Sequence, residues 1–127
     1  MNKILVLLTI LALVCACTSS KPQNQTTGAV PIVATGVVKE FSVTATNFAF
    51  EPGTIEVNLG DTVRLHLLSK EGTHGLAIPA FNITQRMELG QPVDVEFVAD
   101  QAGTFPFVCS VPCGSGHRQM RGSLIVH

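Results

Sequence analysis

Two cysteines, a histidine and a methionine lie within twelve residues near the end of the chain, in the pattern Cys-x-x-x-Cys-x-x-x-His-x-x-Met. They are Cys109, Cys113, His117 and Met120, and a further imidazole stands upstream at His74. Thiolate, thioether and imidazole groups are ligands that suit copper in proteins. Five such groups exceed what one ordinary metal ion needs. The pattern therefore favours a pair of copper ions that share the two sulfurs.

The residues alone leave three other interpretations open. A disulfide between Cys109 and Cys113 fits an oxidising compartment, but it gives His117 and Met120 no role. A zinc site of two cysteines and two histidines is chemically ordinary and leaves Met120 idle. A mononuclear blue-copper site needs one cysteine, two histidines and a weakly bound methionine, so the second cysteine argues against it.

The segments that must position these ligands show the alternation of half-buried β-strands. Apolar and polar residues alternate in four segments, at residues 41–46, 54–58, 63–67 and 93–97. Glycine-containing turns separate the segments. Residues 103–109 and 122–126 predict two further strands, which flank the cysteine-rich segment, and His74 lies near the start of another predicted strand. The sequence therefore predicts an all-β sandwich with the ligands in a loop between two paired strands.

The ligand pattern resembles that of a cupredoxin domain of the binuclear copper A type, as found in subunit II of haem-copper oxidases and in nitrous oxide reductase. The resemblance covers residues 41–127 and implies a cupredoxin-like Greek-key β-sandwich. It also implies that both cysteine sulfurs bridge two copper ions, with His74 and Met120 completing one ion. The second ion would be completed by His117 and by the main-chain carbonyl of Val111, a ligand that does not depend on side-chain type.

Three features depart from the oxidase subunits that this chain resembles. Those subunits usually carry glutamate at the Val111 position, whose carboxylate helps to bind a second metal at a subunit interface. They use a patch rich in tryptophan and tyrosine to receive electrons, and this chain has neither residue. They also have transmembrane helices before the domain, and we expect none here after the N-terminal signal. The resemblance therefore implies the metal centre more strongly than the oxidase assembly.

The N-terminal residues predict export. Residues 1–16 contain a lysine and then a short apolar run, which is typical of a secretory signal and short for a bilayer span. The segment that follows resembles a bacterial lipobox with Cys17 as the lipidated residue, and cleavage without lipidation is the alternative. Thr18 favours the outer membrane, by resemblance to Gram-negative lipoproteins. We expect three parts: a signal peptide at 1–16, a flexible tether at 17–36 and a cupredoxin domain at 37–127.

Composition and ligands together predict an electron carrier of the cell envelope. The formal net charge is −1 and there is no basic stripe, so nucleic acid is not an expected partner. The ligand set leaves no open position for a substrate, so we expect neither catalysis nor a small-molecule substrate. The expected partner is a c-type cytochrome or a terminal oxidase, at the periplasmic or extracellular membrane surface. A copper chaperone or reservoir, and a thiol or copper sensor, would use the same ligands and remain alternatives.

Residues near the ligands have less specific interpretations. Arg118 and Arg121 flank the ligands, and solvated charge is their simplest role, with tuning of the reduction potential or contact with a partner as the alternatives. Phe81 and the apolar residues around Pro79 are a candidate docking surface for a redox partner, with core packing as the alternative for Phe81. The other histidines and methionine are expected to be surface or packing residues: His66, His127 and Met87.

Overall fold

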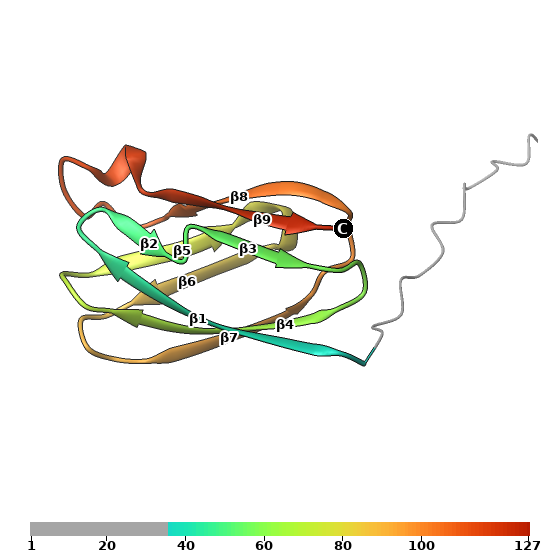
Figure 1. Ribbon diagram of the computed structural model, residues 1–127. Coiled ribbons are helices and arrows are strands. Elements are labelled where there is room, and N and C mark those ends of the chain that lie inside the picture. Colours follow the sequence, from blue (N-terminus) through green and yellow to red (C-terminus); the bar gives the residue numbers. More distant parts are fainter. Residues whose placement is uncertain (1–35) are drawn as a thin grey trace, which may run out of the picture. The chain divides into compact units, whose positions relative to one another are not determined.

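The computed structural model describes residues 36–127. The expected signal peptide, the expected lipidation site at Cys17 and residues 17–35 of the expected tether lie outside the described residues. Two sheets make up the described part (Figure 1). One contains β1 (Val38–Thr46), β2 (Ala49–Glu51), β4 (Thr62–Ser69) and β7 (Val93–Val98). The other contains β3 (Thr54–Val57), β5 (His74–Ile78), β6 (Ile83–Met87), β8 (Gly103–Cys109) and β9 (Arg121–Val126).

Both sheets mix parallel and antiparallel pairs. The four-stranded sheet has the order β2-β1-β4-β7, with β1 and β4 parallel. The five-stranded sheet has the order β3-β9-β8-β5-β6, with β3 and β9 parallel. The remaining strand pairs are antiparallel. This arrangement confirms the predicted all-β sandwich, and β8 and β9 are paired as predicted.

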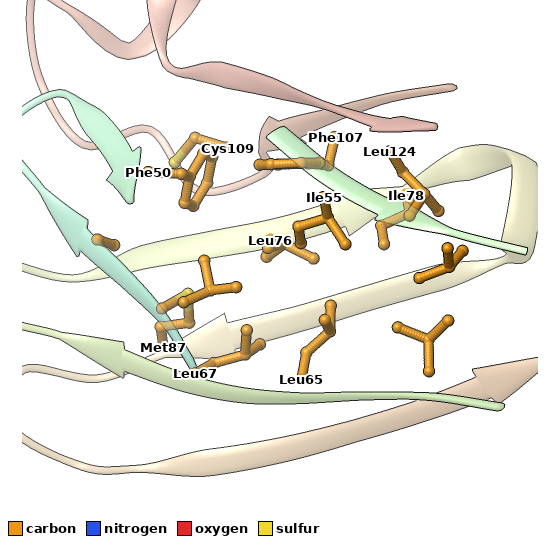
Figure 2. Packing of buried hydrophobic residues seen from close by; sticks show 14 of the residues in the cluster. Phe50, Ile55, Leu65, Leu67, Leu76, Ile78, Met87, Phe107, Cys109 and Leu124 are labelled. Atoms are coloured by element: carbon orange, nitrogen blue, oxygen red, sulfur yellow. The ribbon is translucent and has the colours of Figure 1, made fainter. Parts of the chain in front are cut away.

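The core lies between the inner faces of the two sheets, and strand alternation supplies it. In β4, Val63, Leu65 and Leu67 are fully buried, whereas Arg64 and His66 between them are partly exposed. A period of two places every second side chain on the same face, so this strand is apolar on one side only. Figure 2 shows these leucines among the buried residues contributed by both sheets.

Two strands were missed by the sequence analysis. The strand β2 has only three residues, too few for an alternating pattern to be recognised. In β6 the inward positions are Ile83, Gln85 and Met87, and the polar Gln85 interrupts the apolar series. Two 3-10 helices, η1 (Pro79–Phe81) and η2 (His117–Gln119), are single turns in loops. No helix in residues 36–127 has the length and apolarity needed to cross a membrane.

One end of the sandwich gathers the predicted ligands, and we call it the ligand end. It consists of residues 46–49, 69–75, 86–93 and 109–121, and it lies at the left of Figure 1. The candidate docking residues Pro79 and Phe81 lie elsewhere, because β5 runs from His74 at the ligand end toward η1 at the other end. The Phe81 ring packs against Phe97 and Phe105. These ring contacts support the packing alternative for Phe81, and a docking role for the surface around it stays a prediction.

Candidate metal centre

The loop that carries most of the ligands is fastened at its base. Cys109 is the last residue of β8, and its backbone N–H donates to the carbonyl of Met120, just before β9, at 3.0 Å. The next residue, Ser110, donates its backbone N–H to the carbonyl of Gly75 in β5 at 3.1 Å. The loop of residues 110–120, which we call the ligand loop, is thus bonded to both neighbours of β8 where it begins.

The two cysteine sulfurs lie close together without being bonded. Their Sγ atoms are 3.6 Å apart, well beyond the S–S bond length of about 2.05 Å, and both cysteines are free thiols. Cys109 is 6% exposed and Cys113 is partly buried. Burial raises the pKa of the Cys113 thiol, and the hydrogen bond and charge of the Cys109 sulfur raise it further.

His74 is completely buried, and its backbone surroundings decide which ring nitrogen faces the sulfurs. Its Nε2 lies 2.7 Å from the carbonyl oxygen of Glu71. A carbonyl only accepts, so Nε2 carries the proton and Nδ1 keeps its lone pair. That Nδ1 is 3.9 Å from the Cys109 Sγ. The Ser69 hydroxyl donates to the carbonyl of Gly72 at 2.8 Å, which holds the same turn. The imidazole is therefore oriented with an unprotonated nitrogen toward the thiol, as a metal ligand requires.

His117 lies beside the second sulfur, that of Cys113. It opens the 3-10 turn η2, and its backbone N–H donates to the carbonyl of Gly114 at 3.1 Å. Its Nδ1 lies 3.7 Å from the Cys113 Sγ. Unlike His74, this histidine is only partly buried.

The last two predicted ligands also lie at the site. The Cys109 thiol donates to the carbonyl oxygen of Val111 at 3.2 Å, so this carbonyl faces the sulfurs. Met120 is 1% exposed and belongs to the same buried cluster as Cys109. The fold thus gathers all six predicted ligand residues at the ligand end.

The donor groups fit a thiophilic transition metal. The ligand atoms of His74, Cys109 and Cys113 all lie within 4.8 Å of one another. Metal–thiolate bonds are about 2.3 Å long, so a single ion can contact both sulfurs across their 3.6 Å separation. Two thiols, two imidazoles and a thioether form the soft and borderline set that copper accepts, and a backbone carbonyl can serve as a weak additional ligand.

Close packing against two glycines sets the path of the ligand loop. A Cβ atom at Gly75 would lie 2.3 Å from the Ser110 Oγ and 2.9 Å from a methyl carbon of Val111, so a side chain there would force these side chains to move where the loop leaves β8. A Cβ atom at Gly116 would lie 2.2 Å from the Cδ2 of Phe48 and 2.7 Å from its Cβ. The Phe48 side chain, from the turn between β1 and β2, therefore rests directly on the segment between Cys113 and His117.

The family of the chain follows from residues 6–126, which match the cupredoxin-like domain family. The chain belongs to this family. It is 35% identical over 75 residues to cytochrome c oxidase subunit 2 of Thermostichus vulcanus, covering 59% of this chain and 23% of that protein. It is 29% identical over 84 residues to cytochrome c oxidase subunit 2 of Thermus thermophilus, covering 66% of this chain and 62% of that protein. The chain thus covers less than two thirds of the length of either relative.

A solved structure shares the fold. A chain of a haem-copper terminal oxidase dimer superposes with a TM-score of 0.64 at 25% identity, covering 70% of this chain and 65% of that one. The predicted cupredoxin-like fold and the predicted similarity to oxidase subunit II are therefore confirmed. The ligand assignments themselves stay predictions, which the geometry of the site now supports.

The residues that support the predicted ligands could not be recognised from the sequence. The Glu71 carbonyl and the Ser69 hydroxyl act on His74 through backbone groups and a turn, which no residue pattern reveals. The contact between Phe48 and Gly116 joins segments almost seventy residues apart. In the sequence, the only sign of this contact is the glycines of the ligand loop. They indicate an irregular loop and do not identify the residue that packs against it.

The contact of Gly116 with Phe48 yields a stability prediction. We expect Gly116→Ala to lower the free energy of unfolding by about 1–3 kcal/mol, because the new methyl group overlaps both the ring and the Cβ of Phe48. Urea unfolding of the full chain measures the change. Gly53→Ala is the matched control, since its nearest atom, the Phe50 carbonyl oxygen, is 3.7 Å away. In the Phe48→Ala background the Gly116→Ala loss should be smaller. An equal loss in both backgrounds contradicts the contact.

Proposed function

We propose that this cupredoxin-family protein is an exported one-electron carrier that binds two copper ions. Cys109 and Cys113 would bridge the ions, His74 and Met120 would complete one, and His117 with the Val111 carbonyl would complete the other. Copper, when bound, supplies reversible one-electron redox chemistry. The chain supplies the ligands, their orientation and the exclusion of water.

The arrangement of the two histidines about the sulfurs is the observation that supports two ions. Each imidazole nitrogen faces its own sulfur, at 3.9 Å for His74 and Cys109 and at 3.7 Å for His117 and Cys113. The ligand atoms that all lie within 4.8 Å of one another belong to His74 and both cysteines, and His117 is not among these residues. One tetrahedral zinc ion would draw all four ligand atoms into a single close group. The separation of His117 from that group favours two ions that share the sulfurs.

Burial and backbone bonding support a carrier over a chaperone. The His74, Cys109 and Met120 side chains are at most 6% exposed, so release of copper to an acceptor would require the loop to open. The hydrogen bonds from Cys109 to Met120 and from Ser110 to Gly75 oppose that opening. A site that holds its ligands in one geometry changes little between oxidation states, and small changes favour fast electron exchange.

Export and partner follow from the sequence and from the relatives. We propose that residues 1–16 are a signal peptide and that a lipid on Cys17 anchors the protein at the outer surface of a bacterial membrane. The relatives that this chain matches are named as subunits of cytochrome c oxidases, and we propose a c-type cytochrome or a terminal oxidase as the redox partner. Val111 offers no carboxylate for a second metal at a subunit interface, which favours a separate carrier.

Copper binding is the first test of this proposal. The purified chain should bind two copper ions and turn purple when it holds one electron fewer than the fully reduced form. Electron paramagnetic resonance should then show one unpaired electron shared by two copper nuclei, because both ions contact the same sulfurs. His66→Gln is the control, since His66 lies on β4 and its Nδ1 pairs with Asp94 at 2.8 Å. A hyperfine pattern from a single copper nucleus at full loading would exclude the binuclear site.

The ligands should differ in importance. Cys109→Ser or Cys113→Ser should abolish the binuclear spectrum, because each sulfur contacts both ions. Met120→Leu should keep copper and shift the reduction potential, because an axial thioether is a weak ligand that tunes the potential. Copper content and redox titration of the three variants provide the measurement. Equal copper loss in all three would contradict this order.

Localisation can be tested at Cys17. Cys17→Ser should convert a membrane-associated protein into a soluble exported one, because the lipid is the proposed anchor. Fractionation of cells that express either form measures the change, with Ser19→Ala as the matched control outside the modified position. Membrane association that survives the Cys17 substitution would show that another segment anchors the protein.

A further inference from the structure

The charges of the described residues are unevenly distributed between the ligand end and the rest of the molecule. All nine acidic residues of the chain lie in residues 36–127, together with six of its eight basic residues, so this part has a formal net charge of −3. The ligand end reverses the balance, with four basic and two acidic side chains. They are Lys70, Glu71, Arg86, Glu88, Arg118 and Arg121.

The two acidic side chains of the ligand end are already engaged. Glu71 accepts the backbone N–H of Asn47 at 2.9 Å. Glu88 pairs with Arg86 and accepts the hydroxyl of Thr73, and this hydrogen bonding lowers its pKa. Both carboxylates are exposed, but Glu88 is offset by its pairing with Arg86, so the ligand end keeps an excess of positive charge.

The remaining cations border the exposed part of the metal centre. Arg118 directly follows His117 in η2, and the Arg121 guanidinium donates to the backbone carbonyl of Arg118. Within residues 36–127, neither arginine forms an ion pair with a carboxylate. Both are exposed, whereas His74, Cys109 and Met120 are buried. Of the two predicted histidine ligands, His117 is therefore the one nearer to solvent, and it lies beside two guanidinium groups that have no carboxylate partner within residues 36–127.

We propose that the ligand loop around His117, with Arg118 and Arg121, is the docking surface for a one-electron carrier protein that has an acidic contact face. This inference rests on the proposed function, because it takes His117 as the outlet of the copper centre. One electron passes between the copper centre and the partner's redox group, with no atom transferred. Carboxylates of the partner would pair with the two guanidinium groups, for which arginine geometry is well suited.

A protein fits this surface better than a membrane does. Stable binding to anionic lipid typically requires clusters of about four to eight basic residues, and the ligand end offers two unpaired arginines and Lys70. A small cluster is sufficient to steer a charged protein, because complementary fields raise association rates by roughly 10–1,000-fold at low salt. The partner must also place its redox group close to His117, which a lipid headgroup has no need to do.

The sign of the salt dependence tests the proposal, because the net charge of the domain and the charge of the ligand end predict opposite results. The probes are hexacyanoferrate(III), a trianion, and tris(phenanthroline)cobalt(III), a trication, each of which accepts one electron from the reduced copper-loaded chain. Stopped-flow rates should fall several-fold between 10 and 300 mM salt with the anion and rise with the cation. The opposite signs would overturn the proposal.

Variants assign the effect to the arginines. We expect Arg118→Gln with Arg121→Gln to lower the low-salt rate with hexacyanoferrate(III) by about fivefold. Lys39→Gln is the matched control, since it removes one charge from the start of β1, away from the ligand end. An acidic plant plastocyanin should exchange electrons faster than a basic cytochrome c with the unaltered chain, and the double variant should lose this preference. An unchanged preference would overturn the proposal.

A measurement without copper separates this proposal from the proposed function. Amide chemical shifts of the metal-free full chain should change at residues 115–121 when plastocyanin is added, and the double variant should lose these changes. If the chain binds no copper but shows these shift changes, the proposed function is wrong and the proposed docking surface is retained. Binding of the arginines to phosphatidylglycerol vesicles, without shift changes from plastocyanin, would assign the surface to a membrane and overturn the proposal.

Discussion

The proximity of the two cysteine sulfurs is the constraint on which the rest of the site depends. At 3.6 Å, two thiolates would repel each other by on the order of 4 kcal/mol at the effective dielectric constant of a protein site. Burial is the main cause of the raised pKa of Cys113, and the hydrogen bond and charge of the Cys109 sulfur add to it. The pair is therefore compatible either with protonated thiols or with a cation between the sulfurs. Because metal ligands must be deprotonated, a metal ion removes the electrostatic penalty that the fold imposes.

The five-stranded sheet holds the sulfurs in this position by placing the ligands on adjacent strands. Leu76 of β5 lies opposite Cys109 of β8, so His74 lies two residues away along the neighbouring strand. The ladder between β8 and β9 continues through the hydrogen bond from Cys109 to Met120, which brings the end of the ligand loop back beside its start. Hydrogen bonds of regular structure therefore determine three ligand positions, whereas Val111, Cys113 and His117 depend on the loop itself.

This division explains how much of the site could be predicted from the sequence. Strand alternation predicted the sandwich, and the spacing of the cysteines, histidine and methionine predicted a shared site, because both patterns are local. The role of Ser69 in holding the turn before His74 could not be predicted, since it acts through a backbone carbonyl. The distance of Phe81 from the ligands could not be predicted, because sequence proximity to His74 does not show that β5 carries the chain away from them. The contact of Phe48 with Gly116 depends on how two distant turns meet, which no local pattern encodes.

Under the proposed function, the two histidines would divide the site between chemistry and recognition. His74 is enclosed by the core and by the turn at Glu71, so a substitution near it disturbs the packing and orientation of a ligand. His117 lies on a partly exposed turn whose other residues, Arg118 and Gln119, face solvent. Their side chains can change without altering the sulfur positions, because the backbone of the loop is held by the strands and by glycine contacts. A cupredoxin domain can therefore keep one metal centre while its partner changes, and the surface around His117 is where specificity for a partner can be adjusted at least cost to the centre.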